Sequence, residues 1–395
     1  MKQVFLAPGR DKSLRRRHPW VFSGAVARVD GAPQRGDSVV VRSSAGVFLG
    51  HGVYCPKSQI RVRVMSFDEA VPIDAALVTR RIDAALAFRA RALPADVTAL
   101  RLVHGEADGL PGLVVDRYDD VLVVQCQSAA AEHWRDAAVA ALEPARWRAV
   151  VERSDVEVRA LEGLAPRSGV LHGTLPAAPL VIDEGGVRYH VDVLHGQKTG
   201  FFLDQRDNRA LVGAAAAGGE VLDVFCYSGG FTLAALAGGA AHVTAVDSST
   251  DALAQARANA ALNGCDDGDV RVAWQAEDAF AALRALHAAG RRFDLVVLDP
   301  PKFAPTGRHV QRAARAYKDV NLWALKLLRA GGRLFTFSCS GAVDDALFQS
   351  IVAGAAVDAG VEARVLARLA AAADHPLALN FPEGAYLTGL AVMVG

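Results

Sequence analysis

The fold is decided by residues 221–252, VLDVFCYSGGFTLAALAGGAAHVTAVDSSTDA. This stretch has two short apolar runs, 221–225 and 242–246, with an acid inside the first and directly after the second. Apolar runs of this length are typical of strands that are buried on both faces of a parallel sheet. Residues 232–236 predict a small-residue helix packed on that sheet, so the stretch predicts strand, glycine turn, helix and strand, as in a Rossmann-like α/β fold.

The turn between the two runs predicts a ligand site. Gly229 and Gly230 lack a Cβ atom, so a ligand can approach the main chain closely, and the helix that follows begins with unpaired N–H groups. Asp247 ends the second run, where its carboxylate can accept both hydroxyls of a ribose. The G-x-G-x-x-G spacing of pyrophosphate-binding folds is absent. S-adenosylmethionine, which has a ribose but no phosphate, fits better, and a Rossmann-like core without that ligand is the alternative.

The chain as a whole predicts a cytoplasmic protein with several domains. It has 395 residues with 52% hydrophobic content, which is long for one domain. We expect domains at 1–70, 71–190 and 191–395. Neither a signal peptide nor an apolar membrane-spanning run is expected. The five cysteines are widely spaced and form no C-x-x-C pair, which argues against a disulfide framework and against a zinc or other metal site.

The formal net charge of zero conceals a basic N-terminal segment. Residues 1–65 contain twelve Lys and Arg against three Asp. Short strand-like runs at 38–42, 47–54 and 60–64 predict a small β-barrel. Such a basic segment is typical of binding to a phosphate backbone, and a solvated basic face is the alternative. The predicted RNA contacts are Arg10, Lys12, Arg15, Arg16 and Arg17. Trp20 and Phe22, which follow them, are interpreted mainly as core residues.

Residues 71–190 predict a compact α+β module. A helix is expected at 74–93, ended by Pro94, with strands near 99–104, 113–115, 121–127 and 149–152 and a second helix near 129–142. The polar loop HVDVLHGQKTGFFLDQRDNR, residues 190–209, then leads into the core. Gln205 and Arg206 in this loop are candidates to cover a ligand. The alternative is a linker helix capped by Asp204.

Three further strands end in chemically useful residues. The strand expected at 270–274 is followed by Asp278, placed where an adenine amino group would lie. The strand at 293–298 ends in Asp299-Pro300-Pro301-Lys302, whose two prolines stiffen the carboxyl edge where open α/β sheets bind ligands. The strand at 333–338 ends in Cys339. Runs at 362–369 and 385–394 complete seven strands, and the loop between them, which contains His375, is expected to return across the carboxyl edge.

These motifs together resemble class I S-adenosylmethionine-dependent methyltransferases. More closely, the chain resembles the large-subunit ribosomal RNA methyltransferase I family, which makes 5-methylcytosine in 23S RNA. The resemblance covers nearly the whole length, including the start, HPWVFSGAV at 18–26, which is similar to a PUA domain. The motifs that carry it are DVFCYSGGFT, LDPPKF and FTFSCSG, together with HGEADGLPGLVVDRY at 104–118 and QKTGFFLDQRDNR at 197–209.

The resemblance implies roles for individual residues. It implies that the methionine part of the cofactor lies beside Asp223, Phe225, Ser228 and Gly229. It also implies that Asp247 binds the ribose, that Asp278 binds the adenine, and that Gln205 and Arg206 close the site. It implies that Cys339 is the nucleophile and Asp299 the acid that orients the substrate. We also expect Lys302 and His375 to contact RNA. The expected partner is 23S ribosomal RNA with an unpaired or flipped cytosine, and a homodimer is possible.

The chemistry requires these residue types. Cytosine C5 is a weak nucleophile, so a thiolate adds to C6 first. A free thiol with a pKa of about 8.5 is only slightly ionised at neutral pH, so Cys339 needs local activation. Some RNA cytosine enzymes have a second cysteine beside the proline motif, where this chain has Pro301-Lys302. Asp299, His375 or water must therefore remove the C5 proton.

Three other functions remain open at this stage. A related enzyme that methylates a guanine nitrogen would need no cysteine. A non-catalytic RNA-binding assembly factor could retain the fold, although Asp223, Asp247, Asp278, Asp299 and Cys339 argue against a degenerate site. A small-molecule methyltransferase is disfavoured by the basic front segment.

Overall fold

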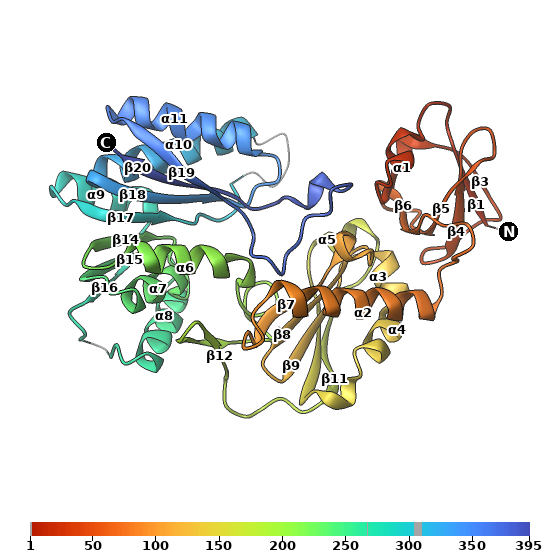
Figure 1. The fold of residues 1–395 in the computed structure, drawn as a ribbon, viewed down its shortest axis with the longest axis horizontal. Helices are drawn as coiled ribbons and strands as arrows, with labels where there is room; N and C mark the ends of the chain where they lie inside the picture. Colours follow the sequence, from red (N-terminus) through yellow and green to blue (C-terminus); the bar gives the residue numbers. More distant parts are fainter. Residues whose placement is uncertain (1, 267, 304–309) are drawn as a thin grey trace. The chain divides into compact units, whose positions relative to one another are not determined.

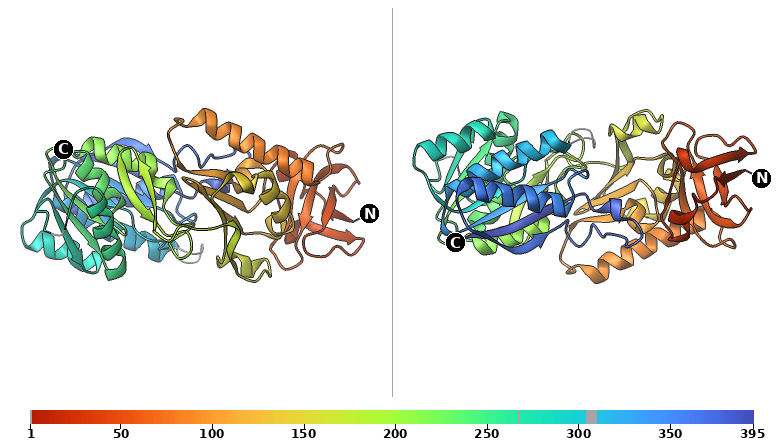
Figure 2. Two further views of the ribbon diagram at one scale, coloured as in Figure 1. Left: turned by 90° about the horizontal axis from the view of Figure 1, so that it is seen from below. Right: turned by 90° about the horizontal axis from the view of Figure 1, so that it is seen from above.

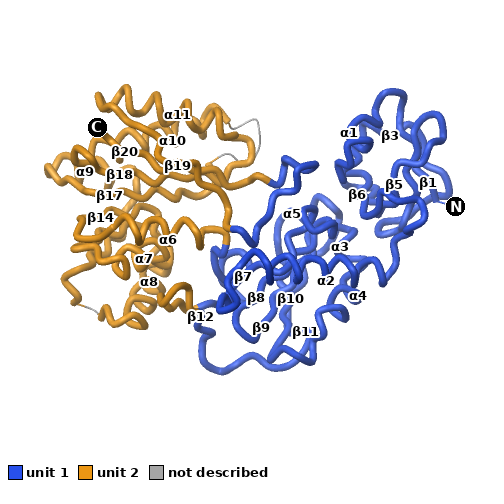
Figure 3. The backbone as a smooth tube through the Cα atoms, viewed as in Figure 1, with its two compact units in different colours: residues 1–182, 191–203, 373–384 blue, residues 183–190, 204–372, 385–395 orange. Residues whose placement is uncertain are grey.

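The computed structural model describes residues 2–266, 268–303 and 310–395. The chain divides into two compact units, coloured separately in Figure 3. Unit 1 comprises Met1–Ile182, Val191–Leu203 and Ala373–Gly384, and unit 2 comprises Asp183–His190, Asp204–Ala372 and Ala385–Gly395. Each unit is described by itself below. In the described part of the chain, no helix is long and apolar enough to cross a membrane.

Unit 1 begins with a six-stranded sheet in the order β2-β6-β5-β4-β1-β3. The strands are β1 (Gln3–Leu6), β2 (Trp20–Phe22), β3 (Val26–Asp30), β4 (Ser38–Arg42), β5 (Phe48–Tyr54) and β6 (Ile60–Ser66). The short helix α1 (Lys12–Arg15) precedes β2. Alternating residues such as Val4, Val41 and Val62 are buried and form the core of this sheet. Trp20 is only half-buried and Phe22 is 48% exposed, so neither is the fully buried core residue that was expected.

The second sheet of unit 1 has five strands in the order β11-β10-β9-β8-β7. They are β7 (Ala99–His104), β8 (Leu113–Tyr118), β9 (Val121–Cys126), β10 (Ala149–Ser154) and β11 (Arg167–Gly173). Its helices are α2 (Ala75–Ala92), α3 (Ala129–His133), α4 (Arg135–Ala141) and α5 (Val158–Leu161). Ile82 of α2 packs in one core with Val115 and Leu122 of the sheet. The helix expected at 129–142 is interrupted at Trp134, which ends α3 and precedes α4.

The segment Ala373–Gly384 belongs to unit 1, although it lies between the last two strands of unit 2. Within unit 1, Asp374 accepts a hydrogen bond from the backbone N–H of Arg101 at 2.8 Å. Further along, the Phe381 ring lies 4.7 Å from that of Trp20, and Glu383 pairs with His18 at 2.9 Å. These contacts explain why this loop is held by unit 1, which its place in the sequence does not indicate.

Unit 2 contains the predicted seven-stranded sheet, in the order β16-β15-β14-β17-β18-β20-β19. The strands are β14 (Glu220–Val224), β15 (His242–Asp247), β16 (Val272–Ala276), β17 (Phe293–Leu298), β18 (Leu328–Ser338), β19 (Ala363–Leu369) and β20 (Thr388–Val394). The first five are parallel, while β20 runs antiparallel to both β18 and β19.

Helices cover both faces of this sheet. They are α6 (Arg206–Ala215), α7 (Gly230–Ala237), α8 (Thr250–Leu262), α9 (Ala279–Ala288), α10 (Val310–Leu327) and α11 (Asp345–Ala359). Figures 1 and 2 show α9, α10 and α11 on one face and α6, α7 and α8 on the other. Ser249 accepts from the N–H of Ala252 at 3.2 Å and caps α8. The hairpin strands β12 (Leu180–Glu184) and β13 (Val187–Val191) precede α6.

Candidate active site

The candidate site lies at the carboxyl ends of three neighbouring strands of unit 2. In the sheet register Asp223 of β14 lies opposite Val297 of β17, and Leu298 of β17 lies opposite Thr336 of β18. Asp299 follows β17 directly, and Cys339 follows β18 directly. The order of the strands therefore brings together three motifs that are 40 to 116 residues apart in sequence, at the edge where open α/β sheets bind ligands.

The turn after β14 has an unusual backbone. Phe225, Tyr227 and Gly229 all have positive φ, of 67°, 48° and 82°. The N–H groups of Phe225 and Cys226 both donate to the carbonyl of Val246, which ties the turn to β15. A Cβ atom on Gly229 would lie only 3.2 Å from the Cβ of Ala256, so both φ and packing favour glycine there. A strained turn at a sheet edge is a frequent feature of ligand sites.

Asp223 is a buried acid in an incomplete hydrogen-bond environment. It is 1% exposed, and its Oδ2 accepts a hydrogen bond from the Thr232 hydroxyl at 2.6 Å. Its Oδ1 has no hydrogen-bond partner among the described residues. Burial raises the pKa of Asp223 to about 7; the Thr232 hydrogen bond opposes that rise, and the carboxylates of Asp299 and Asp247 add to it. The site therefore contains a buried acceptor that still has room for a donor.

The other two predicted cofactor acids also have structural roles. Asp247 accepts from the N–H of Tyr227 through Oδ2 and from the N–H of Ser249 through Oδ1, both at 2.9 Å. Asp278 is exposed and caps α9 by accepting from the N–H of Ala281 at 3.0 Å. A carboxylate has about four lone-pair sites, so each acid retains capacity for a ligand.

Ser228 is the remaining predicted cofactor residue on the turn, and it is buried. Its carbonyl accepts from the side-chain amide of Asn259, which is wholly buried on α8. The same Asn259 accepts from the N–H of His190 at 2.8 Å. Asn259 thus fixes the glycine turn from behind, a role that no motif in the sequence indicated.

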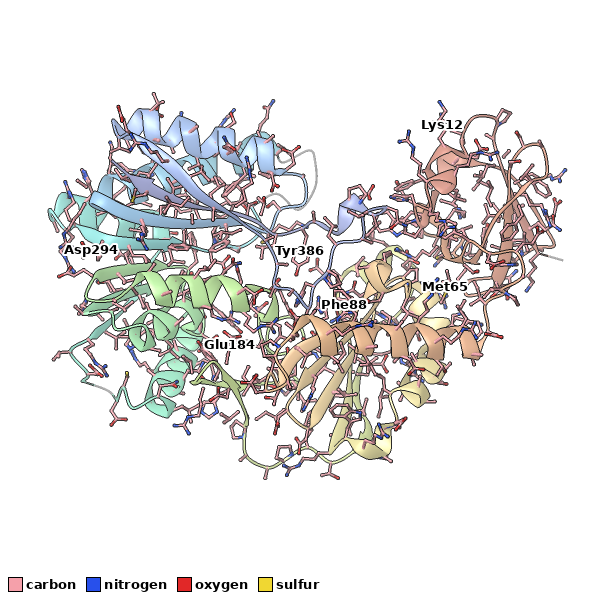
Figure 4. The ribbon with its side chains drawn as sticks, in the orientation of Figure 1. Lys12, Met65, Phe88, Glu184, Asp294 and Tyr386 are labelled. Carbon is pink, nitrogen blue, oxygen red and sulfur yellow. The ribbon has the colours of Figure 1, made fainter. Side chains whose placement is uncertain are left out.

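Gln205 and Arg206 lie at the start of α6 and are buried, at 2% and 8% exposure. Gln205 accepts from the side-chain amide of Asn208 at 2.6 Å. The expectation that Asp204 caps this helix is wrong: the N-cap position is Gln205, and Asp204 instead accepts from the Tyr386 hydroxyl at 2.7 Å. Tyr386, labelled in Figure 4, precedes β20 within the same unit.

Cys339 lies against the proline motif. Its Sγ is 3.9 Å from the carbonyl oxygen of Pro300, and its side chain is half-buried. The next residue, Ser340, has its hydroxyl 3.0 Å from that of Tyr317 on α10, and both residues are fully buried. Burial raises the pKa of Tyr317, so its hydroxyl stays protonated and able to donate. The turn that carries the thiol therefore contacts both the loop after β17 and helix α10.

Aromatic rings connect the same motifs. Phe303 lies 4.9 Å from the ring of Tyr317, 6.3 Å from Phe225 and 6.2 Å from Phe280. Tyr317 and Phe280 belong to no recognisable motif, so the sequence did not identify them as site residues. The one available signal for Tyr317 is its position with Ala313 and Val320 on the apolar face of α10.

The predicted RNA-binding residues fall in both units. Arg10, Lys12, Arg15, Arg16 and Arg17 are all exposed on and beside α1 in unit 1, where Figure 4 shows Lys12. Lys302 is exposed in unit 2. His375 is in unit 1 and only 6% exposed, with its Nδ1 3.0 Å from an oxygen of Asp374. RNA contact by any of these residues stays a prediction.

Comparison with known families gives two matches. Residues 167–368 match a family model described as S-adenosylmethionine-dependent methyltransferase, and residues 4–67 match a PUA-like domain. The chain is also similar to curated proteins called "Ribosomal RNA large subunit methyltransferase I". The one from Shewanella amazonensis is 49% identical over 394 residues, and the one from Shewanella denitrificans is 48% identical over 395 residues. In both cases 99% of each chain is covered.

Solved structures agree with the fold. A chain from Streptococcus mutans described as a SAM-dependent methyltransferase is 22% identical, with a TM-score of 0.85 and full coverage of both chains. A second structure, of SMU.776 complexed with SAH, is 21% identical with a TM-score of 0.86. The predicted fold class, a seven-stranded Rossmann-like sheet preceded by a PUA-like sheet and an α+β part, is confirmed.

Proposed function

The chain belongs to the ribosomal RNA large subunit methyltransferase I family, and on that premise we propose that it forms 5-methylcytosine in 23S ribosomal RNA through a covalent Cys339 intermediate. The observation that carries the proposal is the contact between Cys339 Sγ and the Pro300 carbonyl at 3.9 Å. Because Pro300 follows Asp299 in the chain, this contact supports a role for the thiol next to Asp299 at the ligand-binding edge of the sheet. A family member that methylates a guanine nitrogen would have no use for a thiol there.

S-adenosylmethionine is the cofactor of this family, and the residues present fit it. When bound, it supplies an electrophilic methyl group on a sulfonium. Asp223 offers a buried carboxyl oxygen without a partner in the described chain, which suits the cationic methionine part. We propose that the turn of Phe225, Ser228 and Gly229 lies beside that part, with Asp247 at the ribose, Asp278 at the adenine, and Gln205 and Arg206 closing the site.

Cys339 supplies the covalent step in this proposal. Its thiolate adds to C6 of cytosine, the S–C6 bond forms, and the electron pair of the C5–C6 double bond makes C5 nucleophilic. The Asp299 carboxyl, when protonated, donates to N3 of the base and accepts from the amino group, so it stabilises the charge that develops at N3. Once C5 carries the methyl group, a base removes the C5 proton. The double bond then reforms, and the S–C6 bond breaks to return the thiolate. Asp299 and water are candidates for that base at this edge of the sheet.

The same proposal assigns RNA binding to the basic cluster at 10–17 and to Lys302, and RNA modification to residues 191–395. Residues 1–70 would serve as the RNA-binding domain and 71–190 as the middle domain. The cytoplasm is the proposed compartment. A homodimer is also part of the prediction, and light scattering on the purified chain measures it directly.

The test is methyl transfer from labelled S-adenosylmethionine to 23S RNA, followed by digestion to nucleosides. We expect labelled 5-methylcytidine with the unaltered chain and none with Cys339→Ala. Cys265→Ala is the matched control, because this buried cysteine follows α8, lies outside the glycine turn and has no role in the proposal. A different methylated nucleoside, or full activity of Cys339→Ala, would refute the covalent mechanism.

A second readout detects the covalent bond itself. RNA containing 5-fluorocytidine cannot lose its C5 substituent as a proton, so the Sγ–C6 bond persists after methyl transfer. We expect a protein–RNA adduct that survives denaturation with the unaltered chain and is absent with Cys339→Ser. An equal yield of adduct with that variant would assign the nucleophile to another residue.

A further inference from the structure

Unit 1 contains a hollow of about 500 Å³, of whose lining the proposed function uses only Arg17. It is open to solvent and large enough for a nucleotide, since ligand pockets range from about 300 to 1,000 Å³. Its lining comes from the end of β6, the loop that follows it, helix α2 and the end of the basic cluster. The residues are Arg17, Ser66, Phe67, Asp68, Glu69, Val71, Leu77 and Arg81.

Arg81 is a half-buried cation held in a prepared position. Its Nη2 donates to the carbonyl of Met65 at 3.2 Å. Gly109 makes room for it, since a Cβ there would lie only 2.5 Å from Arg81 Nη1. Burial and the neighbouring Arg80 lower the pKa of Arg81. No carboxylate in the described ranges forms an ion pair with it, although buried charges in proteins are usually paired.

The two acids that line the hollow are exposed, and each has a partner within the chain. Asp68 accepts from the N–H of Ala70 at 2.9 Å, and Glu69 lies 3.6 Å from Arg42. Arg17, at the rim, is exposed and is not ion-paired with any carboxylate in the part of the chain that the structure describes. The two guanidinium groups of Arg17 and Arg81 are therefore available to one anionic ligand, and guanidinium groups bind phosphate well.

An aromatic ring completes the hollow. Phe67 is half-buried and lines it beside the two arginines. Unpaired bases in RNA are commonly recognised by stacking on such rings, while arginines hold the phosphates. Continuity with the basic cluster favours RNA over a free metabolite, because Arg17 belongs both to the cluster and to the hollow.

We propose that this hollow binds one unpaired nucleotide of the substrate RNA, with its phosphate against Arg17 and Arg81 and its base against Phe67. The inference rests on the proposed function for the identity of the RNA. It adds a second point of nucleotide recognition, in unit 1, to the flipped cytosine at Cys339.

The experiment measures binding of a short single-stranded RNA carrying fluorescein to the full chain, by anisotropy, across a series of salt concentrations. For Arg81→Gln we expect about tenfold weaker binding at low salt and a salt slope smaller by about 0.7, the value of one phosphate contact on a single strand. Phe67→Leu should weaken binding at least fivefold without changing the slope, because stacking is worth about 1–3 kcal/mol per base. Arg91→Gln, an exposed arginine on the same helix, is the matched control.

Affinity and slope in Arg81→Gln equal to those of Arg91→Gln would overturn the proposal. Circular dichroism checks the folding of each variant, and Arg17→Gln with Phe67→Leu tests the hollow if Arg81→Gln does not fold. Inorganic phosphate that competes as well as the oligonucleotide would reduce the hollow to an anion site and also overturn it. Methyl transfer separates the two proposals: we expect Arg81→Gln to raise the KM for RNA with kcat unchanged. An unaltered chain that binds RNA without methylating it would refute the proposed function alone.

Discussion

Replacement of Asp223 by asparagine should change how the stability of unit 2 depends on pH. The carboxyl is 1% exposed, and burial raises its pKa from 3.8 to about 7. The folded chain thus holds a proton here at pH values where the unfolded chain has lost it. Asparagine keeps an oxygen that can accept from Thr232 but does not ionise, so Asp223→Asn isolates the effect of the charge.

The sign and size follow from proton linkage. A pKa raised on folding gives stability that is fully present below pH 3.8 and is lost as the pH rises through 7. Each tenfold change in proton affinity is worth about 1.4 kcal/mol, so the full effect is about 4 kcal/mol. About half of it, roughly 2 kcal/mol, falls between pH 5.5 and 8.5.

Urea unfolding of both chains at pH 5.5 and 8.5 measures this difference. The difference in free energy of unfolding, Asp223→Asn minus the unaltered chain, should be about 2 kcal/mol more favourable to the variant at pH 8.5 than at pH 5.5. Asp251→Asn, which removes an exposed carboxylate from the first turn of α8, should show the same difference from the unaltered chain at both pH values. Equal pH dependence of Asp223→Asn and the unaltered chain would refute the argument, since it would mean that Asp223 is ionised in the folded protein at pH 5.5.

Three further predictions concern the site and the basic cluster. Tyr317→Phe removes the hydroxyl that lies 3.0 Å from that of Ser340. The kcat of methyl transfer should fall about tenfold with the KM for S-adenosylmethionine unchanged, and the free energy of unfolding should fall by about 1–2 kcal/mol. An unchanged kcat in steady-state assays would show that Tyr317 does not position the Cys339 turn. Asp247→Asn should raise the Kd for S-adenosylmethionine at least tenfold in calorimetry, and an unchanged Kd would remove the ribose assignment. Lys12→Gln combined with Arg16→Gln should reduce the salt slope of RNA binding by about 1.4, and an unchanged slope would leave the cluster as a solvated face.

The sequence predicted the sheet of unit 2 well because its strands are continuous apolar runs with sharp ends. The run at 293–298 coincides with β17, and the others differ by a few residues at their ends. In unit 1, β11 was missed because nearly all its residues are exposed, so it lacks an apolar pattern. Strands β1 and β3 were missed because they are short and carry mixed polarity.

The site was predictable only where a motif marks it. Asp223, Asp299 and Cys339 each end or interrupt an apolar run, so their placement at one edge follows from the order of parallel strands. Tyr317 and Asn259 act through a single side-chain contact from a helix, which leaves no local pattern. The segment that contains His375 could not be placed from sequence, because its partners, such as Arg101, are more than two hundred residues away.

The contacts of the Cys339 turn with the Pro300 carbonyl and the Tyr317 hydroxyl hold the thiol in position, and both contacts are with neutral groups. Ser340 and Tyr317 fix the turn through fully buried hydroxyls, which are neutral and therefore orient the thiol without attracting or repelling a thiolate strongly. The Pro300 carbonyl, 3.9 Å from Sγ, accepts a hydrogen bond from the thiol and so also orients it. We predict that the thiolate reacts only when a cytosine is bound beside it, where loss of the thiol proton accompanies addition to C6. The bimolecular adduct with 5-fluorocytidine RNA should accordingly form much faster than alkylation of Cys339 in the chain without RNA. Equal rates would mean that the thiolate is already formed before substrate binds.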